Sequence, residues 1–446
     1  MELRPYQVDA ISSWESNGFQ GIWELATGTG KTFTAISATM RLYERLRSEG
    51  ISLNVVVICP YINLVDQWGE AFRKIGWNPV MAYESRDSWT TSLHERQSWL
   101  ALAPGSRSLT IATQTTFNLP EFQRQLKNFS GETLVIGDEV HNLGNARSFN
   151  NLPLKAKYRL GLSATPERYL DPEGTQRILD YFGDVIYRME LKEAILAGWL
   201  TPYRYLPRVV EMSSEETYFY IEISAKLAKV LAGRSLFDLP KSEAERAGKL
   251  IRLRSALIGG VSGKWEPFWE DLKSNQFKNS QLIYCAEGKS PLGSQSRQID
   301  DVKEGIEARG FGSAEIYDAT VKRESRRQIL NNFDEHKLKY ILSMRCLDEG
   351  VDLPNANVGY FLASSSNPRQ FVQRRGRLLR KFENKHESVI FDYFVVPKMS
   401  ALGDNVGVEK SLGKREVNRS LQFIDACNNQ TEAMDKIKNM GDFYGL

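Results

Sequence analysis

The sequence is poor in the residues that hold metal ions and disulfides. It has four cysteines and four histidines among 446 residues, and the cysteines lie far apart with no Cys-x-x-Cys spacing. This pattern supports neither a disulfide framework nor a structural zinc site. We therefore expect reduced thiols and a cytoplasmic protein.

Long apolar runs and a strong excess of one charge are also missing. No hydrophobic stretch approaches the length that spans a membrane, and Met1–Gln7 lacks the apolar core of a signal peptide. The net charge of +3 is only mildly basic, so charge alone does not predict a nucleic-acid partner. We expect no membrane contact, and any basic surface must be local.

The sequence does contain enough apolar residues for two cores. With 446 residues, 41% of them hydrophobic and 25% charged, the chain resembles an ordinary globular protein of two domains. In two separate regions of the chain, short β-branched runs alternate with amphipathic helices. This pattern is typical of parallel sheets covered by helices. The expected strands are 21–24, 53–59, 109–113, 133–137 and 158–163, and then 281–286, 314–318, 339–344, 358–363 and 388–395.

These patterns predict an α/β fold with two parallel-sheet lobes. The first lobe is expected over residues 1–207, because two prolines interrupt the pattern near its end. A helical connecting segment follows over 208–277, and the second lobe occupies 278–400. A helical tail is expected over 401–446.

One stretch in the first lobe, Leu25–Thr32, has the composition of a phosphate-binding loop between a strand and a helix. Glycines let backbone N–H groups face an anion, and the helix dipole points at the same place. Lys31 would reach the β- and γ-phosphates of ATP, and the Thr32 hydroxyl would ligate Mg²⁺. Leu25 stands where the common form of this loop has its first glycine. The ATP-binding residues predicted here are Thr27, Gly28, Thr29, Gly30, Lys31 and Thr32.

Two adjacent acids, Asp138 and Glu139, follow the strand expected over 133–137. Burying both without a cation would be costly. We expect Asp138 to hold Mg²⁺ and Glu139 to activate the attacking water. Ser163 and Thr165 follow another strand and are candidates to relay the state of the nucleotide site.

Two further groups are candidates for contact with the nucleotide. Gln7, with Arg4 nearby, has an amide that suits the edge of an adenine. A basic cluster over Gln373–Arg380 has a charge density that must face something anionic. The arginine spacing favours a γ-phosphate partner supplied from the second lobe, although a solvated basic helix is the simpler alternative.

The order of these motifs resembles that of superfamily 2 helicases and translocases of the DExH kind. The branch with XPB-like DNA translocases and the helicase subunits of restriction enzymes is most similar, mainly because of the Asp-Glu-Gly-Val-Asp-Leu-Pro run at 348–354. The resemblance implies two RecA-like lobes with ATP between them. It also implies a nucleic-acid strand lying across both lobes.

The resemblance carries family roles onto matching positions of this sequence. It assigns Gly350 and Asp352 to nucleotide contact from the second lobe, and His141 to coupling between the lobes. It implies nucleic-acid contacts by loop residues, with Thr113, Gln114 and Arg345 as candidates. The catalytic residues that it implies are Lys31, Asp138, Glu139, Gln373, Arg377 and Arg380.

We therefore expect an ATP-driven, Mg²⁺-dependent DNA helicase or translocase that contacts phosphates rather than bases. It would be the motor of a DNA repair, restriction or phage-defence system, alone or with a partner nuclease or other subunits. The chain itself has no nuclease signature. Two alternatives stay open at this point: a nucleotide-dependent switch or scaffold in a nucleoprotein complex, and an RNA helicase.

Overall fold

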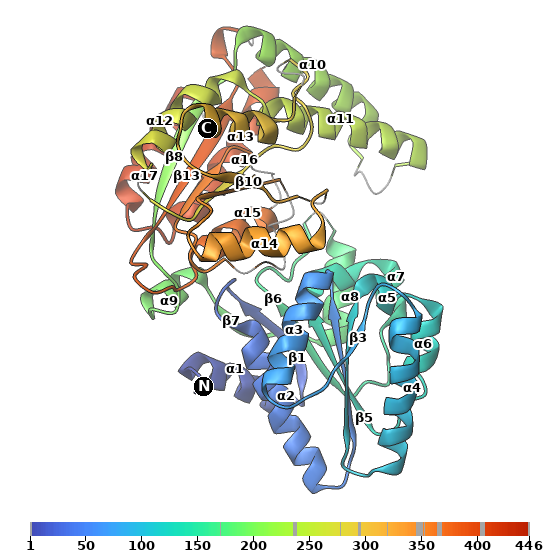
Figure 1. Ribbon diagram of the computed structural model, residues 1–446. Helices are drawn as coiled ribbons and strands as arrows, with labels where there is room; N and C mark the ends of the chain where they lie inside the picture. The colour runs from blue at the N-terminus through green and yellow to red at the C-terminus, as the bar shows by residue number, and fades with distance from the viewer. Residues whose placement is uncertain are drawn as a thin grey trace. The chain divides into compact units, whose positions relative to one another are not determined.

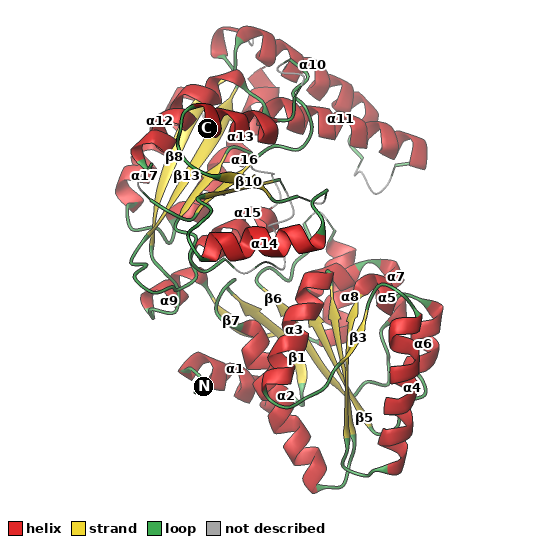
Figure 2. Ribbon diagram, in the orientation of Figure 1, coloured by secondary structure: helices red, strands yellow, loops and turns green. Residues whose placement is uncertain are grey.

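The computed structural model describes residues 2–169, 171–234, 239–276, 278–292, 296–318, 320–344, 351, 353–363, 368–401 and 406–444. Apart from Val351, these residues form two compact units that divide between Ala197 and Gly198. Each unit contains one parallel β-sheet with helices packed against it (Figure 1). The predicted α/β class with two parallel-sheet lobes is confirmed (Figure 2).

The first unit has a seven-stranded sheet in the order β3-β4-β2-β5-β6-β1-β7, and all neighbouring strands run parallel. Its strands are β1 (Gln20–Leu25), β2 (Leu53–Cys59), β3 (Val80–Ala82), β4 (Arg107–Thr113), β5 (Glu132–Asp138), β6 (Tyr158–Ser163) and β7 (Val185–Met189). Every residue of β2 is buried, as its run of valines predicts for a strand covered on both faces.

Helices connect these strands. They are α1 (Pro5–Ser16), α2 (Lys31–Ser48), α3 (Ile62–Lys74), α4 (Asp87–Leu102), α5 (Gln114–Phe117), α6 (Pro120–Leu126), α7 (Ala146–Asn151), α8 (Pro172–Phe182) and α9 (Leu191–Leu196), with a 3₁₀ turn η1 at Val140–Gly144. The short edge strands β3 and β7 were not expected from the sequence. Each is too short to show an extended apolar run, and its position at the edge requires less burial.

The second unit has a six-stranded parallel sheet in the order β10-β11-β9-β12-β13-β8. Its strands are β8 (Tyr203–Glu211), β9 (Gln281–Tyr284), β10 (Ala314–Ile316), β11 (Tyr340–Ser343), β12 (Val358–Phe361) and β13 (Ser388–Val396). Its helices are α10 (Ser214–Leu231), α11 (Lys241–Gly259), α12 (Trp265–Ser274), α13 (Gln298–Ala308), α14 (Arg323–Asp334), α15 (Pro368–Leu378), α16 (Val406–Ile424) and α17 (Gln430–Tyr444), with 3₁₀ turns η3 (Ser262–Lys264) and η4 (Met399–Ala401).

Strand β8 was not predicted, because Pro207 lies within it. The strand is at the edge of the sheet and pairs only with β13, so a residue without an N–H group is tolerated there. The second unit consequently starts at Gly198, ahead of the boundary that we expected after residue 207. The helical stretch expected next in the sequence is present as α10, α11 and α12.

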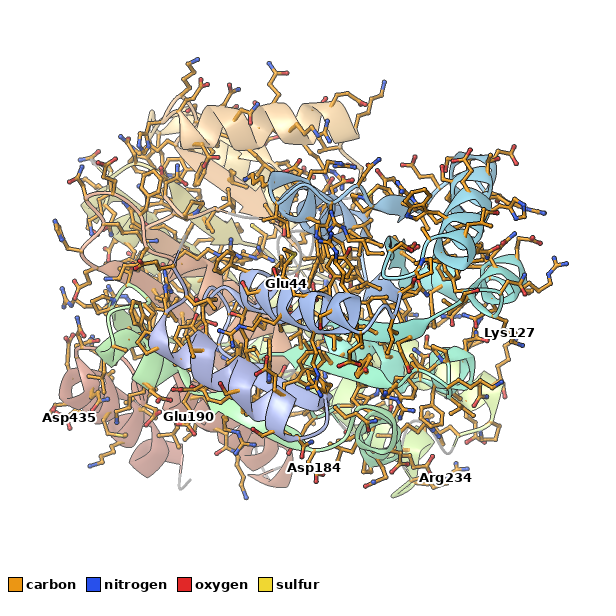
Figure 3. The ribbon with its side chains drawn as sticks, turned by 90° about the horizontal axis from the view of Figure 1, so that it is seen from below. Glu44, Lys127, Asp184, Glu190, Arg234 and Asp435 are labelled. Atoms are coloured by element: carbon orange, nitrogen blue, oxygen red, sulfur yellow. The ribbon has the colours of Figure 1, made fainter. Side chains whose placement is uncertain are left out.

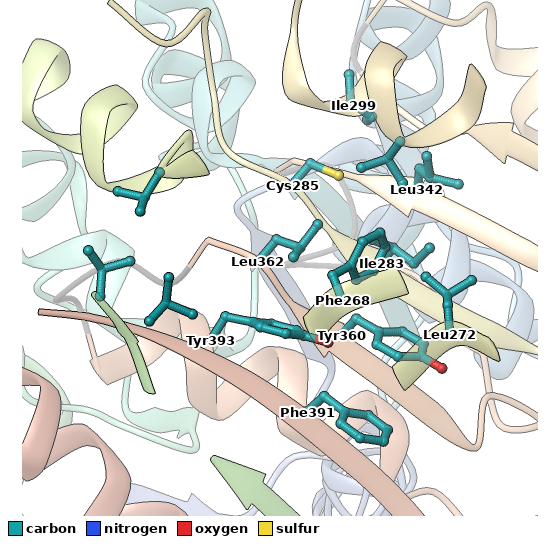
Figure 4. Packing of buried hydrophobic residues seen from close by; sticks show 14 of the residues in the cluster. Phe268, Leu272, Ile283, Cys285, Ile299, Leu342, Tyr360, Leu362, Phe391 and Tyr393 are labelled. Carbon is teal, nitrogen blue, oxygen red and sulfur yellow. The ribbon is translucent and has the colours of Figure 1, made fainter. Parts of the chain in front are cut away.

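Aromatic side chains pack among aliphatic ones in the core of the second unit (Figure 4). Phe268 of α12 is fully buried and contacts the rings of Tyr360 and Tyr393, with centroids 5.7 and 6.1 Å apart. Trp265 and Trp269 stack on each other at 5.9 Å and pack against this core. These aromatic residues of α12 therefore pack the core, as the amphipathic pattern of the helix indicates.

The helical tail belongs to the fold of the second unit. Phe423 of α16 stacks on Tyr205 of β8 at 4.9 Å between ring centroids, and its carbonyl accepts a hydrogen bond from Tyr203. Arg419 donates to the fully buried carboxylate of Asp392 at 3.1 Å. The tail thus supplies the counter-charge for an acid inside the second sheet.

Charged side chains such as Glu44, Lys127 and Arg234 lie on the outside of their units (Figure 3). Among the described residues, no helix combines the length and the apolar character that crossing a membrane requires.

We predict that Arg419→Leu lowers the free energy of unfolding by about 3–5 kcal/mol, because it removes a guanidinium counter-charge from the buried Asp392 carboxylate. Urea titration monitored by circular dichroism measures this change. Lys436→Ala, which removes a half-exposed partner of Glu432, is the control and should change stability by less than about 0.5 kcal/mol. Equal effects of the two substitutions would contradict the assigned role of Arg419.

Candidate functional site

Three neighbouring strands of the first sheet end in residues that carry chemistry. The phosphate loop follows β1, Asp138 ends β5, and Ser163 ends β6, which lies between them. The register pairs Glu24 with Ser163 and Asp138 with Leu162. Because parallel strands end at a shared edge, the fold brings these predicted residues together.

The phosphate loop curls as its glycines predict. Gly28 and Gly30 have φ angles of 90° and 96°, in the left-handed region that favours glycine. A Cβ atom on Gly30 would also lie 3.3 Å from Nε2 of Gln7, which is a tight contact. A larger residue is therefore disfavoured both by the backbone angle and by this contact. The Thr29 hydroxyl closes the turn by donating to the Ala26 carbonyl at 2.8 Å. Helix α2 then begins at Lys31, with its positive end at the loop.

Lys31 and two threonines complete the loop. The Lys31 ammonium donates to the Leu25 carbonyl at 3.2 Å, so it lies over the loop. The Thr27 hydroxyl is buried and has no hydrogen-bond partner among the described residues. Thr32 is half-buried in the first turn of α2. This donor set of N–H groups, hydroxyls and one ammonium suits a polyphosphate.

Helix α1 docks against the phosphate loop. Tyr6 donates its hydroxyl hydrogen to the Thr29 carbonyl. The Gln7 amide accepts from the Arg4 N–H at 2.9 Å and donates to the Thr34 hydroxyl of α2 at 3.0 Å. One amide hydrogen and one lone pair of Gln7 are left by these two bonds. Its use for reading adenine stays a prediction, as does that of Arg4.

Asp138 is buried and its carboxylate is held at both oxygens. Oδ2 accepts from the Trp68 indole at 2.8 Å, and Oδ1 accepts from the Glu139 N–H at 3.0 Å. Burial raises the pKa of Asp138, whereas the Trp68 hydrogen bond and the charge of Lys31 lower it. Each oxygen keeps a lone pair, so Asp138 with the Thr32 hydroxyl fits a Mg²⁺ ion, which prefers oxygen ligands.

Glu139 has an unusual backbone conformation that aims its side chain at two neighbours. Its φ of 45° is left-handed, which costs a non-glycine residue on the order of 1–3 kcal/mol. The carboxylate lies 3.5 Å from the Ser163 hydroxyl, which donates to it, and 3.6 Å from Nδ1 of His141. Strain of this kind concentrates where function requires a fixed geometry.

His141 is fully buried, and its hydrogen bonds fix its tautomer. The Asn142 amide donates to Nε2 at 3.1 Å, so the proton of a neutral ring sits on Nδ1. Nδ1 then donates to the Ser163 hydroxyl at 3.1 Å. Ser163 also accepts from the Thr165 N–H at 3.0 Å. The three predicted coupling residues thus share one hydrogen-bond network with Glu139.

The predicted nucleic-acid residues Thr113 and Gln114 make local hydrogen bonds in the first unit. The Thr113 hydroxyl caps α5 by accepting from the Thr116 N–H at 3.2 Å. The Gln114 amide donates to the Asn142 carbonyl at 2.7 Å and to the Ser148 hydroxyl at 2.8 Å. Their contact with nucleic acid stays a prediction, while Gln114 is joined to the His141 loop.

Two arginines of α15 in the second unit have structural partners. Arg374 donates to the carbonyls of Ala363 (2.6 Å) and Met344 (2.8 Å) and lies 4.7 Å over the Tyr284 ring. Arg375 donates to the Gln422 carbonyl at 2.5 Å and lies 5.1 Å over the ring of Phe423. Carbonyls and aromatic faces therefore help to accommodate these two charges, and the contact of the basic cluster with an anion stays a prediction.

The other predicted residues of the cluster are Gln373, Arg377 and Arg380. Gln373 and Arg377 are buried, and Oε1 of Gln373 has no hydrogen-bond partner among the described residues. Burial lowers the pKa of Arg380 to about 10. Their contact with a γ-phosphate stays a prediction. The predicted residues Arg345, Gly350 and Asp352 lie outside the described residues.

Sequence reasoning missed three contributors to the site. Trp68 was not among the predicted site residues, although a buried indole N–H generally needs an acceptor. Tyr6 precedes Gln7, and in this stretch only the Gln7 amide and Arg4 were predicted to contact the nucleotide. Asn142 directly follows His141 and gave no signal, because its partners come together only in the folded structure.

Comparisons with known proteins agree with this arrangement. Residues 1–168 match the family model of the type III restriction enzyme res subunit, and residues 270–382 match the helicase conserved C-terminal domain. The DNA 3′-5′ translocase XPB2 of Sulfurisphaera tokodaii is 25% identical over 398 residues, covering 85% of this chain and 79% of that protein.

Two solved structures share the fold. The ATP-dependent type ISP restriction-modification enzyme LlaBIII, solved bound to DNA, matches 95% of this chain with a TM-score of 0.61 and 18% identity. The match covers only 30% of that enzyme. The match to the Hef helicase domain of Pyrococcus furiosus covers 88% of this chain and 95% of the Hef chain, with a TM-score of 0.54 and 17% identity.

We predict that Trp68→Phe raises the pKa of Asp138 further, because a hydrogen bond that favours the charged carboxylate is lost. The ionised carboxylate is the form that binds Mg²⁺. As the pH is lowered, the variant should therefore lose Mg²⁺-dependent nucleotide binding at a higher pH than the parent protein does. At high pH the two proteins should have the same nucleotide affinity. Calorimetric titration across pH measures this.

Trp89→Phe is the matched control for that experiment, because the Trp89 indole is equally buried and has no hydrogen-bond partner among the described residues. It should leave the pH dependence unchanged. A loss of binding in Trp68→Phe that is the same at every pH would show that the indole acts by packing alone.

Proposed function

We propose that this chain, which belongs to the superfamily 2 helicases and translocases related to XPB and to restriction-enzyme subunits, moves along DNA by hydrolysing ATP. It is an ATP-hydrolysing helicase or translocase by its family. The DNA substrate, the metal and the residue roles given below are parts of the proposal.

The first unit would bind the nucleotide and carry out the attack by water. The backbone of the phosphate loop and Lys31 hold the phosphates, and Asp138 with Thr32 ligates Mg²⁺, which supplies charge neutralisation at the phosphates. Glu139 orients the attacking water and accepts its proton. Its strained backbone and its bond from Ser163 fix the carboxylate in place, which supports this role.

Arg377 and Arg380 would complete the site from the second unit. The second sheet follows the first in the chain and has no phosphate loop in its sequence, so the γ-phosphate that these guanidinium groups would contact must be held by the first unit. Desolvation strengthens the attraction between such a cation and a phosphate, because the local dielectric is low. Closure on ATP and reopening after hydrolysis would move the two units along the strand.

One observation carries the link between DNA and turnover. A continuous hydrogen-bonded path runs from Gln114 through Asn142, His141 and Ser163 to Glu139. Gln114 lies at the start of α5, where backbone phosphates of a strand would be contacted. Movement of Gln114 on binding DNA would thus shift the residue that orients the water.

We predict that Gln114→Ala keeps the basal ATPase rate and loses most of its stimulation by DNA, because it removes the bonds to Asn142 and Ser148 and leaves the contacts of Glu139 itself in place. The measurement is ATPase rate against single-stranded, duplex and forked DNA and RNA. Gln123→Ala is the control, since the Gln123 side chain donates to the Phe117 carbonyl and is not part of the path to Glu139.

The same panel of nucleic acids separates the alternatives. Stimulation by RNA but not DNA would favour an RNA helicase. A slow rate indifferent to every nucleic acid would contradict the proposal and favour a nucleotide-dependent switch.

We predict that Arg377→Ala and Arg380→Ala each lower kcat by about 10³–10⁵, as loss of an arginine finger does, with little change in ATP affinity. ATPase rates at saturating DNA, measured beside DNA affinity, test this. Lys381→Ala, which removes an exposed neighbouring cation, should leave saturated turnover unchanged. Near-normal turnover in both arginine variants, with weaker DNA binding, would assign the cluster to DNA contact instead.

A further inference from the structure

The first unit has a concave site at the end of its sheet opposite to the phosphate loop. A cavity of about 570 Å³ is lined by the C-terminal ends of α2 and α4 and by the start of β4. Lys31 and Arg47 lie at the two ends of α2, so 16 residues at 1.5 Å each separate the phosphate loop from this cavity by about 24 Å. We call it the arginine pocket and define it by Tyr43, Arg47, Trp77, Arg96, Trp99 and Arg107.

All charged side chains that line the arginine pocket are positive. None of the residues that line it is acidic, and none of its three arginines takes part in an ion pair with another described residue. The Arg107 guanidinium lies 4.6 Å from the ring centroid of Trp77 and 5.0 Å from that of Tyr43, and it donates to the Gly76 carbonyl. These contacts pre-position a guanidinium group whose remaining donors suit an anion.

Helix α4 adds an apolar rim. Arg96 and Trp99 are three residues apart on the face that lines the cavity, while Leu93 and Leu100 point into the core. Trp99 is 56% exposed, and Leu102 beside it is 81% exposed. Arginine and tryptophan are enriched at protein interfaces, and an exposed leucine gains stability only where a partner buries it.

We propose that the arginine pocket binds an acidic segment of a protein partner, one that places a carboxylate among the arginines and an apolar side chain against Trp99. The charge of the pocket is complementary to such a segment, and the apolar rim favours a peptide over a nucleic acid. A cavity of about 570 Å³ holds a few side chains rather than a duplex. LlaBIII, of which the match covers 30%, shows that a motor of this fold can work with much additional protein.

A phage-displayed library of random dodecapeptides, selected on the full chain, tests the proposal. Clones are counter-selected on the Arg47→Glu/Arg96→Glu double variant, in which the charge of the pocket is reversed at two half-exposed or exposed positions. The expected result is enrichment of peptides that combine Asp or Glu with an aromatic or aliphatic residue. Failure to enrich any peptide that discriminates the parent protein from the variant overturns the proposal.

Fluorescence anisotropy with the labelled consensus peptide measures the affinity of the peptide for each variant. Arg47→Glu and Trp99→Ala should each weaken binding by at least about tenfold, as loss of a charge pair or an anchor does. Arg45→Glu is the matched control, because it makes the same charge change on the same helix outside the pocket. ATP turnover should be unchanged in all three variants.

Binding of a labelled DNA oligonucleotide is measured in parallel on the same variants. Unchanged DNA affinity is expected. If Arg47→Glu and Trp99→Ala weaken DNA binding and Arg45→Glu does not, the pocket is a nucleic-acid site and the proposal of a protein partner is wrong.

Discussion

The candidate site depends on the parallel pairing of β5, β6 and β1, whose carboxyl ends meet at one edge of the first sheet. This edge places Asp138, Ser163 and the phosphate loop near one another although they are far apart in sequence. It also buries a carboxylate, which is unfavourable unless donors or cations compensate it. For Asp138, the Trp68 indole, the Glu139 N–H and the charge of Lys31 compensate this cost. The residues that surround Asp138 are therefore constrained to supply donors or positive charge.

In the second unit the constraint is the burial of several cations together with the acid Asp392. Arg374 and Arg375 are stabilised by carbonyls and by aromatic faces, and Arg419 is stabilised by Asp392. The tail contributes to stabilising these cations, since Phe423 and Gln422, which contact Arg375, come from α16. The same segment that looks like a C-terminal appendage in sequence therefore holds the helix that carries Arg377.

Much of this arrangement could be predicted from sequence, because it rests on local patterns. Buried β-branched runs identified the central strands, and glycines before a Lys-Thr pair identified the phosphate loop and its left-handed backbone. The edge strand β8 could not be predicted, since Pro207 is acceptable only at an edge and the sequence does not say which strand lies there. The partners of Trp68, Gln114 and Arg375 could not be predicted either, because each bond joins segments that only the folded chain brings together.

The central claim is that arginines of the second unit reach a phosphate held by the first. The most direct measurement is the distance between spin-labelled residues at the exposed positions Glu70 and Glu383, with Glu139→Gln present so that ATP persists. ATP and DNA together should shorten this distance, and the change should disappear when Arg377 and Arg380 are both replaced by alanine. A distance that is the same with and without ATP, or a closure that does not require these arginines, would contradict the account.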